Sequence, residues 1–331
     1  MDEVVAHSYV GYHYRQVLMS DSADPFAEPS SPTPTGAPTI SVIVCTRNRA
    51  ASLNNTLNAF KTLDMTGVLP IEVIVVDNGS TDNTAAVVEG HVTNGGLPLR
   101  RVWEPAPGLS RARNTGIEAS RGTIIAFTDD DCLVSPDWLQ AATKAFASGL
   151  RQVIAGRVDI HDPEHLRTSI RLGTDTEVLT RADQVGGFLI GANMAFGRRV
   201  WDEIGPFDTM FGAGTPLRAA EDTEFAYRAM THGITVRYEP AFGGSHNHGR
   251  KDPAELSALI YGYAMGTGAM TMKYAIEGNR RLIKPLYWDL RSAMRNTWRQ
   301  PSTWLELYGR RGFATGALRY YRAWHRKEIT L

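Results

Sequence analysis

Residues 123–131 read TIIAFTDDD, an apolar run that ends in three consecutive aspartates. The run is typical of a β-strand, and the carboxylates follow at its exit. Adjacent carboxylates repel one another, and a bound cation would neutralise them. The stretch therefore predicts a strand with a metal site at its end. An acidic loop ahead of a helix that begins near 135–137 is the alternative interpretation.

The sequence around this stretch alternates between strand and helix patterns. Strands are predicted at 40–45, 71–76, 99–103 and 123–127, and helices at 50–63, 83–90, 110–120 and 136–147. Such alternation is typical of a parallel sheet with helices on both faces. The predicted fold is therefore α/β, with a mostly parallel Rossmann-type sheet.

Three of these strands end in polar residues. Thr46, Arg47 and Asn48 follow the first strand, Asp77 and Asn78 follow the second, and the aspartates at 129–131 follow the fourth. Ligands of parallel sheets bind at the carboxyl ends of the strands, so we expect these residues to converge on one edge. Ordinary turn chemistry is the alternative for each exit taken separately.

The second half of the chain has a different pattern. A glycine-rich strand is predicted at 186–193, helices at 198–204 and from about 220 to 232, and a strand at 234–238. A glycine-bearing loop at 211–215 separates the two helices, and the remainder from 253 is predicted to be helical. We expect three regions: an N-terminal extension or linker at 1–38, a catalytic body at 39–252, and a helical C-terminal extension at 253–331.

Composition narrows the class of protein. The chain has 331 residues, and its 35 basic residues balance its 35 acidic ones, which gives no indication of nucleic-acid binding. Two cysteines without a paired spacing favour a reducing, cytoplasmic compartment. Neither a signal peptide nor an uninterrupted apolar run of about 18 residues is apparent, so no membrane-spanning helix is predicted.

The C-terminal region carries an excess of positive charge. Residues 273–331 contain 13 Lys or Arg and 4 acidic residues, interleaved with tryptophans. One interpretation is a set of amphipathic helices on a membrane surface, which would make the protein peripheral. The other is helices that pack on the body or on a second subunit as a homo-oligomer.

Four segments, in order, resemble a known family. They are SVIVCTRNR at 41–49, VIVVDNGSTDNT at 73–84, GLSRARNTGI at 108–117 with FTDDD at 127–131, and AAEDTEFAYR at 219–228. Together they resemble the inverting glycosyltransferases of family 2, which have the GT-A fold. The resemblance implies metal-dependent transfer of a sugar from a nucleotide diphosphate donor, expected to be a UDP-sugar. The acceptor would be a hydroxyl of a glycan or lipid-linked molecule, and the cofactor Mn2+ or Mg2+.

The resemblance also implies roles for the donor-site residues. Asp77 would contact the base, or else only begin a turn, and Asp131 would bind the metal. Asp129 would contact ribose or the metal, and Asp130 is expected to point away from it. The remaining predicted donor contacts are Thr46, Arg47, Asn48, Asn78, Arg113 and Asp130, although an exposed position for Arg113 is an alternative.

The same resemblance predicts the catalytic base and a further metal ligand. Asp222 would be the general base, because inversion needs a carboxylate on the face opposite the leaving group. The alternative is that Glu221 and Asp222 only interact favourably with the dipole of the helix that they begin. His246 would add a nitrogen ligand, with His248 as the alternative. The predicted sugar contacts are Gly191, Ala192, Asn193, Gly214 and Glu221.

Two other functions compete with this hypothesis. A sugar-nucleotide pyrophosphorylase generally has a glycine-rich loop after the first strand, whereas this chain reads CTRNRAAS there. A non-catalytic nucleotide-sugar or glycan-binding module would not need the intact acidic motifs. A dinucleotide oxidoreductase is disfavoured because GxGxxG is absent.

Overall fold

The computed structural model describes residues 39–94, 96–282, 304–326 and 328–329. The first half of the described chain forms the predicted alternation. Its strands are β1 (Ile40–Thr46), β2 (Ile71–Asp77), β3 (Leu99–Trp103) and β4 (Ile124–Asp129). Its helices are α1 (Ala50–Ala59), α2 (Thr84–Thr93), α3 (Leu109–Ala119) and α4 (Trp138–Ala145). The four predicted strands are confirmed to within two residues at either end.

The second half adds strands of mixed direction. They are β5 (Cys132–Val134), β6 (Gln152–Ile160), β7 (Glu177–Val178), β8 (Asn193–Gly197) and β9 (Thr235–His246). The order across the sheet is β3-β2-β1-β4-β8-β6-β9-β5, with β7 paired to β9. Strands β1 to β4 are mutually parallel, whereas β8 is antiparallel to both β4 and β6. The sheet is therefore mixed, and the α/β prediction is confirmed.

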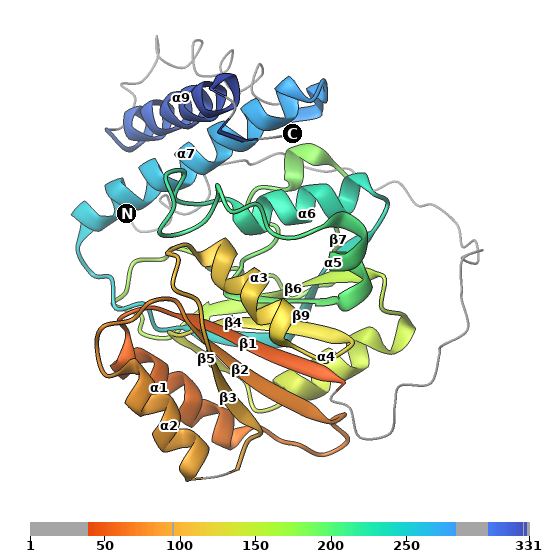
Figure 1. Cartoon of the computed structure of the whole chain (residues 1–331). Coiled ribbons are helices and arrows are strands. Elements are labelled where there is room, and N and C mark those ends of the chain that lie inside the picture. Colours follow the sequence, from red (N-terminus) through yellow and green to blue (C-terminus); the bar gives the residue numbers. More distant parts are fainter. Residues whose placement is uncertain (1–38, 95, 283–303, 327, 330–331) are drawn as a thin grey trace.

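The alternation of side chains along β1 separates two cores. Val42 and Val44 pack with α1, α2 and α4 on one face, and Ile43 packs with α3 on the other. The second face also receives α5 (Arg198–Ile204) and α6 (Glu221–Thr231). Figure 1 shows α3 and α6 on this side of the sheet. Both faces of the sheet are thus covered by helices, as the apolar strands require.

Two C-terminal helices form an outer layer beyond α6 (Figure 1). They are α7 (Pro253–Ile276) and α9 (Trp304–His325). Tyr261 lies against Gly312 and Met265 against Gly316, so the two helices run in the same direction where they touch. Tyr320 of α9 is buried and packs against Phe211 of the body. Packing on the body, one of the two interpretations of this region, is therefore observed for α7 and α9.

Three strands were missed and one was misplaced by the sequence prediction. The glycine-rich strand expected at 186–193 is wrong: residues 186–192 form turns, and β8 begins only at Asn193. Gly187 has φ +72°, a conformation that glycine tolerates and a strand does not use. The strand predicted at 234–238 extends to His246, with a register shift against β6 at Gly156/Arg157.

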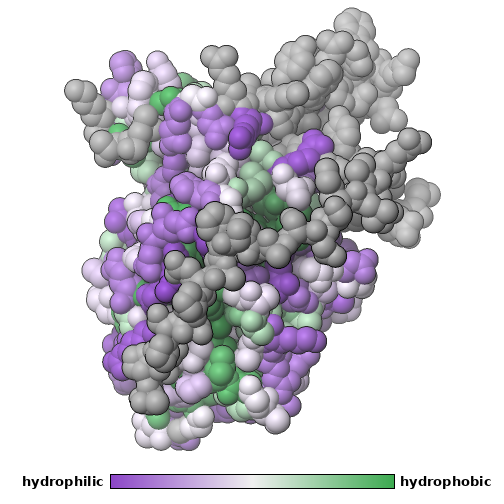
Figure 2. All heavy atoms as spheres, turned by 90° about the vertical axis from the view of Figure 1, so that its right-hand side faces the viewer, coloured by the Kyte–Doolittle hydropathy of each residue, from purple (hydrophilic) through white to green (hydrophobic). Residues whose placement is uncertain are grey.

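Among the described helices, none is both long and apolar enough to cross a membrane. Figure 2 shows one face of the molecule, on which hydrophilic residues predominate and apolar residues gather in separate smaller areas. The tryptophans at 288 and 298 and the arginines at 291, 295 and 299, considered in the membrane interpretation, lie outside the described residues.

Candidate active site

The aspartate stretch lies at the turn between β4 and β5. Asp129 ends β4, and Asp130 and Asp131 form the turn before β5 begins at Cys132. Asp130 and Asp131 are each only 4% exposed, whereas Asp129 is half-buried. Asp129 lies beside Cys45 of β1 in the sheet register, close to the exit of the first strand. The predicted convergence of these two strand exits is therefore observed.

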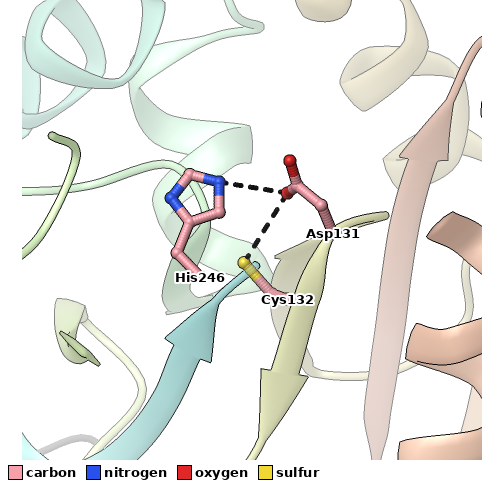
Figure 3. A group of neighbouring side chains, drawn as sticks. All are labelled: Asp131, Cys132 and His246. Atoms are coloured by element: carbon pink, nitrogen blue, oxygen red, sulfur yellow. Dashed lines mark hydrogen bonds and ion pairs between the residues drawn. The ribbon is translucent and has the colours of Figure 1, made fainter. Parts of the chain in front are cut away.

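Strand pairing brings His246 to Asp131. Strand β5 pairs antiparallel with the end of β9, and Cys132 lies opposite His246. His246 Nε2 is 3.1 Å from Asp131 Oδ1. Possible ligand atoms of Asp131, Cys132 and His246 all lie within 4.8 Å of one another (Figure 3). Among the described residues, this is the cluster that could hold a metal ion.

Opposite charges stabilise the Asp131–His246 pair in spite of its burial. Burial opposes ionisation of Asp131, but its hydrogen bond with His246 and the positive charges of His246 and Arg49 hold its pKa below the ordinary range. Burial likewise opposes the charge on His246, but Asp131 outweighs it and raises the imidazole pKa. Burial raises the pKa of Cys132 well above its usual value, so it is a neutral thiol and a poor ligand.

Arg49 is a site residue that the sequence interpretation missed. Its Nη2 is 2.7 Å from Asp131 Oδ2, and its Nε is 3.3 Å from Asp130 Oδ1. The hydroxyl of Thr46 donates to the other oxygen of Asp130 at 2.7 Å. Burial raises the pKa of Asp130 to about 7, although Arg49 and Thr46 oppose this. Asp130 thus faces the end of β1, while Asp131 faces His246; the signal for Arg49 was its place in the motif CTRNR.

Arg113 is buried between two acids. It is 2% exposed, which rules out the exposed alternative. Its Nη1 is 2.8 Å from Glu221 Oε1, and its Nη2 is 3.9 Å from Asp129 Oδ1. A Cβ atom added at Gly191 would lie 2.4 Å from Nη2, so a larger residue there would push the guanidinium out of its present position. Arg113 therefore joins the metal motif to the acidic motif of α6.

Asp222 lies in the first turn of α6. Its Oδ2 accepts a hydrogen bond from the Gly191 amide at 2.8 Å, and its Oδ1 accepts one from Thr223 N at 2.6 Å. The residue before the helix, Ala220, has φ +75°. The adjacent Glu221 is buried, and this burial together with the charge of Asp222 raises its pKa to about 7 against the effect of Arg113. Asp222 is the more exposed acid of the two.

Asp77 is buried at the exit of β2. Its Oδ1 accepts a hydrogen bond from Ser80 N at 3.0 Å, so the expected turn is present. Its Oδ2 accepts one from Arg101 Nη1, also at 3.0 Å. Arg101 lies on β3, next to the exposed ring of Trp103. A carboxylate and a guanidinium therefore stand side by side at this corner of the sheet edge.

Several other predicted donor or sugar contacts have structural partners. The Asn78 amide binds the carbonyls of Glu104 and Ala106 and accepts from Gly108 N. Asn48, with φ 54°, accepts a hydrogen bond from Thr81 N, while Arg47 is exposed. These contacts connect the first two strand exits and the loop before α3. The two asparagines therefore already serve the local backbone.

The side chains of Asn193 and His248 are engaged by partners other than the acids. The Asn193 amide donates to Arg157 O and Phe242 O and accepts from Trp138 Nε1. Both ring nitrogens of His248 are engaged, with Leu166 O and with Arg250 N. His246 is thus the histidine available to Asp131.

The remaining predicted sugar contacts surround Asp222 and the loop before α6. Gly191 donates its amide to Asp222, and Ala192 is buried beside it. Gly214 is exposed in the loop that leads to α6, with its Cα side facing Gly108. Gly191 therefore lies at Asp222 through a hydrogen bond of its amide, whereas Gly214 belongs to the loop that precedes α6.

The sequence is similar to those of known glycosyltransferases. The profile described as glycosyl transferase family 2 matches residues 41–205, and that of glycosyl transferase family group 2 matches residues 124–305. Glycosyltransferase AglE of Haloferax volcanii is 27% identical over 63% of this chain and 67% of its own length. Validoxylamine A glucosyltransferase of Streptomyces hygroscopicus is 28% identical over 67% of this chain, but over only 59% of its own length.

Two solved structures show the same fold. Mannosyltransferase PcManGT from Pyrobaculum calidifontis, in complex with GDP-Man and Mn2+, superposes with a TM-score of 0.56 at 21% identity. That superposition covers 92% of this chain and 80% of the other. Residues 1–349 of S. aureus TarS, in complex with UDP-GlcNAc, give a TM-score of 0.50 at 16% identity, over 87% of this chain and 92% of the other. The expected GT-A type of fold is confirmed by these likenesses.

Proposed function

Because this chain belongs to glycosyl transferase family 2, we propose that it transfers a sugar from a nucleoside diphosphate donor to an acceptor hydroxyl with inversion at the anomeric carbon. The observation that carries the proposal is the separation of two acidic groups joined by Arg113. One group holds Asp131 and His246 at the sheet edge, and the other presents Asp222 on α6. Direct displacement needs a charge-stabilising side and a base side, and these two groups provide them.

The metal side would be held by Asp131 and His246. A buried carboxylate and an imidazole suit Mn2+, which accepts both oxygen and nitrogen ligands, better than Mg2+, which prefers oxygen. His246 Nε2 points toward Asp131, so a cation could take the place of the proton between the two side chains (Figure 3). A divalent cation bound there would offset the charge that develops on the leaving diphosphate. Arg49, 40% exposed at its side chain, could then turn from the aspartates to the phosphates.

The corner at Asp77 favours a uracil base. Uracil presents one N–H between two carbonyl oxygens. Each Asp77 oxygen already accepts one hydrogen bond, and either can still accept the N–H of a base. Arg101 beside it can donate to a carbonyl. One N–H donated to Asp77 and one carbonyl that accepts from Arg101 match the edge of uracil, so we propose a UDP-sugar as the donor, and GDP-mannose in the binding panel tests guanine instead.

Asp222 is proposed as the general base. Its two oxygens are oriented by Gly191 N and Thr223 N, which fixes the carboxylate without neutralising it. The neighbouring Glu221 is buried and paired with Arg113, and it anchors the start of α6 in the interior. The acceptor hydroxyl would lose its proton to Asp222 as the new glycosidic bond forms and the bond to the diphosphate breaks.

Substitution of the base tests this function. Asp222→Asn should lower transfer by about 10²–10⁴-fold, because a positioned base contributes that much, while donor binding survives. Asp202→Asn, an exposed aspartate on α5, is the matched control and should keep full activity. Donor binding is measured as the thermal shift with UDP-glucose, UDP-N-acetylglucosamine and GDP-mannose, with and without Mn2+. Saturating donor at about 100 times Kd stabilises by roughly 2.7 kcal/mol.

Two outcomes would count against the proposal. A fully active Asp222→Asn variant would remove the base assignment. Binding of a donor without any Mn2+-dependent hydrolysis or transfer would instead favour a non-catalytic binding module.

The acceptor is proposed to be a glycan or a lipid-linked molecule, and α9 supports a membrane surface as its source. Tyr308, Leu318 and Tyr321 are exposed on α9, together with Arg311 and Arg322. Basic and aromatic side chains on one helix suit the interface of an anionic membrane. Co-sedimentation with phosphatidylglycerol vesicles, lost in Arg311→Glu/Arg322→Glu, is the expected result; a dimer that hides this face would favour the homo-oligomer.

A further inference from the structure

Helix α7 touches the bend that presents Asp222. A Cβ atom added at Gly266 would lie 2.5 Å from Ala219 O and 2.9 Å from Ala220 Cβ. The bend itself is strained, since Arg218 and Ala220 have φ values of 67° and 75°. Strain of this kind persists where the surroundings enforce it, and the backbone of α7 is part of these surroundings. The C-terminal helix therefore lies next to the proposed base.

Tyr263 lies on α7 one helical turn before Gly266, so both residues share a face of the helix. Its hydroxyl and the hydroxyl of Ser169 share a hydrogen bond of 2.5 Å. Ser169 belongs to the segment between β6 and β7 and has φ 53°. Tyr263 thus links α7 to a strained position of that segment. Its side chain is held by the helix at one end and by Ser169 at the other.

Tyr263 is partly exposed, and its hydroxyl is engaged by Ser169. Burial of the hydroxyl raises its pKa, and the negative charges of Asp222 and Glu221 raise it further against the effects of Ser169 and Arg250. The residue as a whole is nevertheless 44% exposed. Because Ser169 engages the hydroxyl, the ring is the part of Tyr263 left for a ligand, and α7 packs against Ala219 and Ala220, the bend that leads to Asp222.

A fixed, exposed aromatic ring beside a base is suited to one class of ligand. Tyrosine supplies a rigid apolar face at low cost in conformational entropy, and the entropy of this side chain is already reduced by Ser169. The C–H face of a pyranose ring is apolar, while its hydroxyls are polar. Stacking on Tyr263 would leave those hydroxyls free to point toward Asp222.

We propose that Tyr263 is an acceptor-binding residue that stacks against a pyranose ring of the acceptor and orients its hydroxyl toward Asp222. The inference rests on the proposed transferase function and adds to it the chemical class of the acceptor and a contribution from α7. The competing role for Tyr263 is structural, as a tie between α7 and the segment that contains Ser169.

The test uses the full chain with Mn2+ and whichever of the three nucleotide sugars gives the largest thermal shift. Nucleotide release is followed with a panel of p-nitrophenyl glycopyranosides. Tyr263→Ala should raise the KM for the best glycoside about tenfold, while the donor KM stays within about twofold. Tyr263→Phe keeps the ring and should remain within about threefold of wild type. Met65→Ala and Leu69→Ala, at exposed positions between α1 and β2 (43% and 38%), are the controls and should change neither KM.

Each contrary result has a definite meaning. An unchanged glycoside KM in Tyr263→Ala, or an equal change in both KM values, would overturn the proposal in favour of the structural tie. If Tyr263→Ala does not fold, Tyr263→Leu fills the space without an aromatic face and should show the same selective rise. If no glycoside raises nucleotide release in the wild-type protein, the pyranose assignment is wrong. Mn2+-dependent hydrolysis of the donor would still leave the proposed transferase function standing.

Discussion

The two sides of the candidate active site are built differently. The side proposed to bind the metal uses strand exits and a short turn: parallel strands place Thr46 and Asp77, and the turn between β4 and β5 places Asp131. The base side uses a strained bend, a loop segment and helices from distant parts of the chain, which meet at Asp222 and Tyr263. Family segments supply both sides, since AAEDTEFAYR contains Asp222. The segment around Ser169 and helix α7 lie outside these segments, and there acceptor selection can vary without disturbing the sheet.

Removing the residue that joins the two sides should have the largest effect. Arg113→Met leaves Glu221 buried without its ion-pair partner, which we expect to cost about 3–5 kcal/mol of folding free energy. Arg111→Met, an exposed arginine on the same helix, should stay within about 0.5 kcal/mol. Urea unfolding of both variants measures the difference. Equal stability of the two would show that the two sides are held together by other contacts.

A matched pair of substitutions separates the aspartates of the metal side. Asp131→Asn removes a ligand carboxylate and should weaken Mn2+ affinity in the presence of donor by about 10–100-fold or more. Asp130→Asn keeps its contact with Thr46 and should weaken it much less. Calorimetric titration of Mn2+ into each variant gives the comparison. Loss of affinity in Asp130→Asn alone would exchange the roles of the two residues.

The smallest expected effect is a pH dependence confined to the metal side. His246 must lose the Nε2 proton to become a ligand, and Asp131 raises the pKa of the metal-free imidazole. Protons therefore compete with Mn2+ for His246 as the pH falls through that raised pKa. The Mn2+ affinity should fall by at most about tenfold per pH unit. Titrations at pH 6, 7 and 8 should show stronger binding at higher pH, and His246→Asn should flatten the curve. A flat curve for the wild-type protein would exclude His246 as a ligand.

The sequence predicted the first half of the sheet well for a physical reason. Strands β1, β2 and β4 are apolar runs buried on both faces, and each ends in polar residues that mark its exit. Strands β5 to β8 were missed or misplaced because they are short, irregular or interrupted by glycine. The pairing of Cys132 with His246 depends on β5 and β9, so no local pattern could show that His246 meets Asp131.

The candidate site was predicted in part. Asp131, His246, Asp222 and Glu221 came from the family resemblance, and the structure gives each a specific partner. The buried position of Arg113 and the Arg49 bridge were not predicted, because both depend on partners far away in sequence. Tyr263 had no signal at all, since an aromatic residue in an apolar helix is indistinguishable from core until its exposure is known.

Arg101 also lies on an edge strand of the sheet, in addition to its contact with Asp77. It lies on β3, the outermost strand at one end of the sheet, beside Arg100, which pairs with Glu72. An uncovered strand edge can recruit a strand from another molecule, and charged side chains along it discourage this. The guanidinium that would face the nucleobase therefore also helps to keep separate copies of the chain from joining edge to edge.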